Sequence, residues 1–275
     1  MGLIPDWLLY GSAVALMVIV PGRWADKSMS PPAPPPPAPG EAALFATYSP
    51  FSHNEIISLP MMNDIDYRGT AFSVSKSGEW VLARESIRNC RYPFLNLGGH
   101  LGVRIRVQYK RSLDNYVLAV TESGARPLPF ADPKTIKPGM RGFMPGFPQD
   151  QVGEATGRLI GETRLKTGKR FEAAEPVLAW AEAGHTEDVS GSLNKLLGGP
   201  TLNAQSQVIG ITLKTKPRRG RLYSSTPATL AKIGNTPSRT YDFEHEDLLT
   251  RRNYGIVSDT LRRDYRVAQV GCIQS

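Results

Sequence analysis

Short runs that alternate apolar and polar residues dominate the chain between about residue 60 and residue 230. The run Val103-Arg104-Ile105-Arg106-Val107 alternates strictly, as expected for an antiparallel strand with one solvated face. Glycine (26 residues) and proline (23 residues) supply the turns between such runs. We therefore predict an all-β fold, with strands at residues 69–74, 80–83, 102–109, 116–121 and 208–213.

The last forty residues predict two further elements. The segment from Ser258 to Asp264 has the composition of a short helix, with Ser258 as its N-cap. The apolar alternation of Arg266-Val267-Ala268-Gln269-Val270 predicts a final strand. Residues 236–275 are thus expected to form a C-terminal extension that packs on the preceding domain.

The N-terminus differs from this pattern, because residues 7–22 contain no charged side chain. The stretch is shorter than the roughly 20 residues of a usual membrane span, but Trp7, Tyr10 and Trp24 bracket it as interfacial anchors do. Residues 1–6 carry no lysine or arginine, which disfavours a cleaved signal peptide. We predict a transmembrane anchor over residues 1–24, with a signal peptide or a buried helix as alternatives. Residues 25–57 follow as a proline-rich linker, in which polyproline II would act as a semi-rigid spacer.

Composition and charge limit the functions that the chain can have. The chain has 275 residues, of which 40% are hydrophobic, enough for a sizeable core. Its net charge of +8 suggests an anionic neighbour, and we favour a basic surface that faces a membrane over nucleic-acid binding, since no nucleic-acid motif is found. No zinc spacing, phosphate-binding loop or dinucleotide motif appears, so we expect neither cofactor nor metal. The basic residues gather in three runs, near residues 164–170, 214–221 and 262–266.

Several motifs occur in an order that is informative as a set. The turn Lys195-Leu196-Leu197-Gly198-Gly199-Pro200 precedes the apolar run Val208-Ile209-Gly210-Ile211. Upstream lie Gly69-Thr70-Ala71-Phe72-Ser73-Val74, Asn115-Tyr116-Val117-Leu118 and Gly146-Phe147-Pro148. In order and spacing, these motifs resemble those of the bacterial trypsin-like (chymotrypsin-fold) serine peptidases, whose reactive serine lies in a Gly-x-Ser-Gly-Gly-Pro turn.

The resemblance implies two six-stranded antiparallel β-barrels within residues 58–235. It also places Glu85, Asn115 and Leu197 where the family has its catalytic histidine, aspartate and serine. In the oxyanion turn, Lys195 replaces a glycine, whereas Gly198 and Gly199 are retained. A triad needs an attacking hydroxyl, an imidazole base and a carboxylate that orients it. None of the three is present at these positions, so the resemblance implies a degenerate site without a catalytic residue.

Other residues near these positions fit the motifs less well. Shifting the aspartate position to Asp114 would turn every side chain of that strand to the other face. Ser86, Ser190 and Ser192 are nearby hydroxyls, but none is followed by Gly-Gly-Pro. The four histidines lie in no recognisable triad context. Two alternative functions stay open: an active serine-type endopeptidase with a non-standard site, and a polyanion-binding surface protein.

The resemblance points to a single-pass inner-membrane protein with a periplasmic body, which binds or regulates a polypeptide or envelope protein. Arg23 and Lys27 after the span favour a cytoplasmic body instead, by the positive-inside rule. The two cysteines bear on this choice. A bond between Cys90 and Cys272 would close a loop of about 180 residues, worth about 5 kcal/mol in the chain-entropy model. The alternative is two reduced, buried thiols, as in a cytosol. We favour the disulfide.

Overall fold

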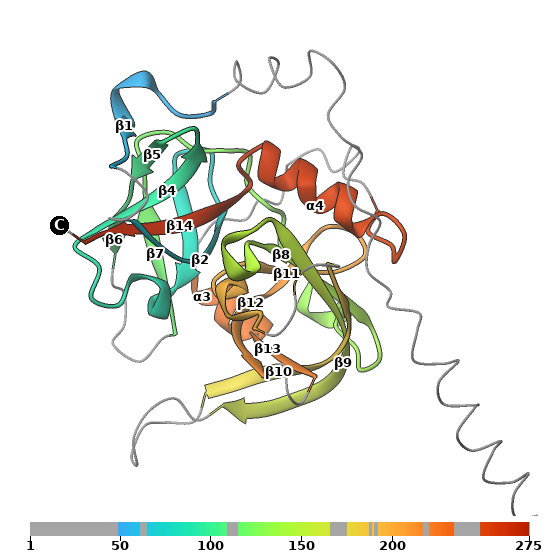
Figure 1. Ribbon diagram of the computed structural model, residues 1–275. Coiled ribbons are helices and arrows are strands. Elements are labelled where there is room, and N and C mark those ends of the chain that lie inside the picture. Colours follow the sequence, from blue (N-terminus) through green and yellow to red (C-terminus); the bar gives the residue numbers. More distant parts are fainter. Residues whose placement is uncertain are drawn as a thin grey trace, which may run out of the picture.

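Two β units lie side by side, and the helix α4 (Tyr254–Arg263) runs along one of them (Figure 1). The computed structural model describes residues 49–60, 65–108, 115–165, 175–186, 189, 192–216, 220–233 and 248–274. The predicted anchor, residues 1–24, and most of the linker, residues 25–57, lie outside this set. Within it, no helix is long and apolar enough to cross a membrane.

The first unit is an eight-stranded antiparallel sheet in the order β1-β5-β4-β14-β2-β3-β7-β6. Its interior is built around side chains such as Trp80, Leu82 and Leu95, which are fully buried. The strands are β1 (Ile56–Ser58), β2 (Ile65–Ser73), β3 (Glu79–Ala83), β4 (Tyr92–Gly98), β5 (Leu101–Arg104), β6 (Arg106–Gln108), β7 (Tyr116–Val120) and β14 (Val267–Ile273).

The second unit is a closed six-stranded barrel in the order β10-β13-β12-β11-β8-β9. Trp180, Met144 and Leu196 fill its interior. The strands are β8 (Arg141–Gly146), β9 (Gly153–Leu165), β10 (Glu175–His185), β11 (Pro200–Leu202), β12 (Val208–Lys216) and β13 (Arg221–Ser225).

The prediction of a mostly β fold with two units is confirmed. The second unit is a six-stranded barrel, whereas the first is an open sheet of eight strands. The sheet exceeds the six predicted strands by β1 at its edge and by the C-terminal strand β14, which lies between β4 and β2 and is antiparallel to both. The predicted strand 102–109 is divided into β5 and β6. The division falls at Ile105, which is buried and whose amide donates to the carbonyl of Pro93.

The predicted C-terminal helix is present, but its predicted start is wrong. The helix α4 begins at Tyr254, so Ser258 lies buried within it instead of capping it. The helix extends further back because Tyr254 and Val257 bury apolar surface between the two units. Asn253, whose Oδ1 accepts from the amide and the hydroxyl of Thr250, organises the turn before it. The shorter helix α3 (Pro227–Ile233) follows β13.

A disulfide joins Cys90 to Cys272, with the two Cα atoms 5.7 Å apart. Cys90 follows the 3₁₀ turn η3 (Arg84–Ile87), and Cys272 lies in β14. The bond therefore ties the C-terminal strand to the segment after η3, as predicted from the sequence.

Candidate functional site

The glycine turn that contains Leu197 is held by buried leucines. The 3₁₀ turn η6 (Asn194–Leu196) precedes it, and Leu193 and Leu196, three residues apart, both point into the barrel core. Leu196 is fully buried, whereas Leu197 is only partly buried. An apolar residue at position 196 thus gives this turn a hydrophobic anchor.

The turn presses against the first unit at Gly198. This residue has φ +88°, and a Cβ atom there would lie 2.3 Å from the carbonyl oxygen of Thr70 and 2.4 Å from the amide nitrogen of Ala83. Only glycine fits, both for conformation and for space. Thr70 adds two hydrogen bonds: its amide donates to Leu197 O (2.9 Å) and its hydroxyl to Lys195 O (2.9 Å).

The three predicted triad positions come from segments that meet here. Ala83 contacts Gly198, and the amide of Arg84 donates to the carbonyl of Asn115 at 2.9 Å. Glu85 lies exposed on η3, where its carboxylate pairs with Arg88 at 2.6 Å. Asn115, just before β7, donates its side-chain amide to the carboxylate of Glu175 on β10. The side chains of Glu85 and Asn115 are therefore engaged by Arg88 and Glu175.

Among the alternative residues, Ser86 is buried, and its Oγ has no hydrogen-bond partner within the described part of the chain. A Cβ atom on Gly69 would lie within 3 Å of both Ser86 Oγ and Leu197 O, so Gly69 leaves room for both. Ser192 Oγ accepts from the amide of Asn194 at 3.3 Å. Asp114 and Ser190 lie outside the described residues.

Four backbone amides of the turn, those of residues 196–199, donate hydrogen bonds within the fold. Leu196 N donates to Leu193 O (3.1 Å), and Leu197 N to Asn194 O (3.2 Å). Gly198 N donates to Thr212 O (2.8 Å), and Gly199 N to Leu196 O (3.0 Å). An oxyanion hole needs donors that point at the reacting oxygen. These four amides offer none in this conformation.

A partly exposed ion pair connects the turn to a neighbouring loop. Lys195 Nζ lies 2.7 Å from Oδ1 and 2.6 Å from Oδ2 of Asp150, in the turn η5 (Pro148–Asp150) after β8. Gln149 and Asp150 have φ of 53° and 68°, unusual for residues other than glycine. Burial and, to a smaller extent, the charge of Asp150 raise the pKa of Tyr67. No sequence signal marks Asp150 as the partner of Lys195, because the contact depends on how two distant loops pack.

A second polar contact fixes the same turn to β12. Thr215 Oγ1 donates to the side-chain oxygen of Asn194 at 2.8 Å. Together with the Lys195–Asp150 pair, it leaves η6 attached on two sides.

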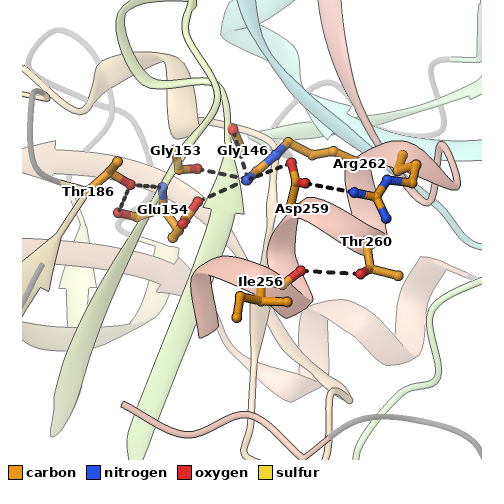
Figure 2. A network of polar contacts seen from close by, with 9 residues as sticks. Gly146, Gly153, Glu154, Thr186, Ile256, Asp259, Thr260 and Arg262 are labelled. Carbon is orange, nitrogen blue, oxygen red and sulfur yellow. Dashed lines mark hydrogen bonds and ion pairs between the residues drawn. The ribbon is translucent and has the colours of Figure 1, made fainter. Parts of the chain in front are cut away.

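A buried ion pair attaches α4 to the barrel (Figure 2). Arg262 Nη1 donates to Glu154 Oε2 at 3.0 Å and to the carbonyl of Gly153 at 3.2 Å, and both charged side chains are nearly inaccessible. Burial raises the pKa of Glu154, while the charge of Arg262 and its hydrogen bond act in the opposite direction. The sequence places Arg262 in a basic run and gives no sign of this burial. Within the described residues, no group of three His, Cys, Asp or Glu side chains could hold a metal ion.

Comparisons with known proteins agree with the fold. No protein-family model matches the chain, and no curated protein matches its sequence. Among solved structures, the HtrA-type protease AlgW with a decapeptide has a TM-score of 0.50 at 13% identity, over 60% of this chain and 50% of that chain. An AlgW variant with a tripeptide has a TM-score of 0.51 at 13% identity, over 62% and 57%. The inactive form of the protease Rv3671c has a TM-score of 0.48 at 20% identity, over 74% and 99%.

The chain thus spans about half of the AlgW chain. The structural match, the closed barrel and the motif order lead to one conclusion: the described part of this chain has the trypsin-like serine protease fold.

Proposed function

We propose that this protein is a catalytically inactive homologue of trypsin-like serine proteases, which binds or regulates a polypeptide. One observation carries the proposal: the turn expected to hold the nucleophile has Leu197 at that position, and the amides of residues 196–199 donate within the fold. A leucine side chain has no atom that can attack a carbonyl.

The surroundings of Leu197 support the same conclusion. Glu85 could act as a base, but its carboxylate is exposed and paired with Arg88. Asn115 is neutral, so it cannot stabilise an imidazolium. An active site of this type needs a nucleophile, an oriented base and an oxyanion hole together. Glu85, Asn115 and Leu197 offer neither a nucleophile nor an oriented imidazole, and this supports the proposal.

The experiment labels the full chain with a fluorophosphonate probe, which reacts with activated serines. The native chain is compared with a variant carrying Glu85→His, Asn115→Asp, Lys195→Gly and Leu197→Ser. The change at Lys195 also removes the ion pair to Asp150, which frees the turn to reorganise. A matched control carries the same changes except that Leu197 becomes alanine.

We expect labelling of the restored variant alone. Labelling of the native chain contradicts the proposal of inactivity. Silence of the restored variant, if it is folded by circular dichroism, contradicts the assignment of these positions.

The proposal that the protein binds a polypeptide rests on the edge strands of the first unit. An inactive protease homologue keeps strands to which an extended segment can add by main-chain hydrogen bonds. In the first unit, β1 and β6 end the sheet.

We further propose that residues 7–22 anchor the protein in the inner membrane and that the body lies in the periplasm. The Cys90–Cys272 bond supports an oxidising compartment, since disulfides persist there and are rare in the cytosol. Cell fractionation tests the anchor: the full chain should stay in the carbonate-washed membrane, and a chain without residues 1–24 should be released. Release of both would contradict the anchor.

A further inference from the structure

Two arginines lie directly opposite each other on neighbouring strands of the barrel. In the antiparallel pair β8–β9, Arg141 is in register with Arg158. Residues in register on neighbouring strands have Cβ atoms about 5 Å apart, and like charges in such pairs are destabilising. The pair therefore costs stability unless something neutralises it.

The contacts that the structure describes for these two arginines are with a hydroxyl and a carbonyl. Arg141 Nη1 donates to the hydroxyl of Thr156 at 3.3 Å, and Arg158 Nη1 to the carbonyl of Gly139 at 3.2 Å. Within the described residues, neither guanidinium lies within 4 Å of a carboxylate. Arg141 is half-buried and Arg158 is exposed, so part of each guanidinium can reach a ligand.

A third arginine, Arg251, precedes the helix that packs on this strand pair. The first residue of this helix, Tyr254, packs on Phe143 with ring centroids 5.6 Å apart. Phe143 is two residues from Arg141 on β8. Burial lowers the pKa of Arg141, and the nearby charges of Arg158 and Arg251 lower it further.

The two ends of α4 contrast in charge. Near its C-terminal end, Arg262 meets the carboxylates of Glu154 and Asp259 (Figure 2). Its first turn contains no acidic residue. The helix dipole is positive at the N-terminal end, so it adds to the potential of the arginines there.

We infer that Arg141 and Arg158 form a binding site for a phosphate group on strands β8 and β9. The guanidinium fork matches the oxygens of a phosphate, and several forks can bind one group. A phosphate monoester carries a charge of about −1.5 to −2 at pH 7, and so offsets more of this positive charge than a single carboxylate. Its source is a free phosphate or the headgroup of an anionic lipid.

Isothermal titration calorimetry of the full chain with inorganic phosphate tests the site, against sodium chloride at equal ionic strength. The Arg158→Gln variant should bind phosphate about tenfold more weakly, the change expected for one lost charge-assisted hydrogen bond. The matched control is Arg104→Gln, which removes one exposed arginine from β5 in the other unit and should bind as the native chain does.

A second titration, with glycerophosphoglycerol, distinguishes the sources. Tighter binding than inorganic phosphate assigns the site to a lipid headgroup, and weaker binding assigns it to a free phosphate or monoester. Both results support the site if Arg158→Gln weakens binding. The inference is overturned if sodium chloride gives the same heat as phosphate, or if Arg158→Gln and Arg104→Gln behave alike.

Discussion

Lys195 and Asp150 form an ion pair in which the ammonium group contacts both carboxylate oxygens, at 2.7 and 2.6 Å. The pair connects the turn that holds Leu197 with the loop after β8. At the position where the sequence resemblance predicts a glycine, Lys195 supplies a side chain that connects the two loops.

We expect this tether to contribute little to overall stability. Both side chains are more than 30% exposed, and exposed pairs are worth about 0–1 kcal/mol. A double-mutant cycle with Lys195→Met and Asp150→Asn, followed by urea unfolding, should give a coupling of about 0.5 kcal/mol. A coupling above about 2 kcal/mol would mean that the pair, and not the buried leucines, fixes the turn.

The two leucines of the turn should differ strongly in what their removal costs. Leu196→Ala leaves a cavity in the barrel core and should lower the free energy of unfolding by about 2–5 kcal/mol. Leu197→Ala, at a partly exposed position, should lower it by about 1 kcal/mol or less. Urea unfolding of the two variants measures the difference. Equal losses would contradict the burial described for Leu196.

Glu154 should make stability depend on pH. Burial raises its pKa above the ordinary value of 4.5 despite the opposing effect of Arg262, so the folded state binds more protons than the unfolded state between the two pKa values. The contribution of this carboxyl to stability is therefore highest below pH 4.5. It falls as the pH rises through the pKa of the folded state.

The Glu154→Gln variant does not titrate at this position and can still accept a hydrogen bond from Arg262. Its free energy of unfolding, relative to that of the native chain, should rise with pH over that interval and then level off. A difference that stays constant from pH 4.5 to pH 8, as measured by urea unfolding, would show that the pKa of this carboxyl is not raised.

The disulfide should be a major source of stability. Cys90 and Cys272 are 182 residues apart, and the chain-entropy model assigns a loop of this size about 5 kcal/mol. Replacing both cysteines by alanine should lower the free energy of unfolding by about 2–5 kcal/mol. Adding reductant should destabilise the native chain and leave the variant unchanged. Reaction of both thiols with an alkylating reagent shows that the reductant has opened the disulfide. If the free energy of unfolding of the native chain is then unchanged, this role is contradicted.

Local patterns were sufficient for most strands of the fold. The alternating runs around Phe72, Val81 and Leu118 lie in β2, β3 and β7, because short-range alternation records which face of a strand is buried. The first unit was not predictable in detail. The position of β14 between β4 and β2 depends on pairing between residues nearly 200 positions apart, and the start of α4 depends on burial against Phe143.

The candidate site shows the same limit. The motif order indicated which segments should meet, and Gly198, Ala83 and Asn115 do come from segments in contact. The partners of their side chains were not predictable. Lys195 with Asp150, Asn115 with Glu175 and Arg262 with Glu154 each join loops or strands from distant parts of the chain. The type of a polar residue can be read from the sequence. Its partner depends on how distant segments pack in the fold.

The most direct measurement follows the fate of a polypeptide mixed with the native full chain. Casein carrying self-quenched fluorophores reports binding as a rise in anisotropy and cleavage as a rise in intensity. The account predicts no rise in intensity above the buffer control, at concentrations where anisotropy increases. A rise in intensity with the purified native chain, abolished by Glu85→Ala or surviving it, would contradict the central claim that this chain does not cleave peptide bonds.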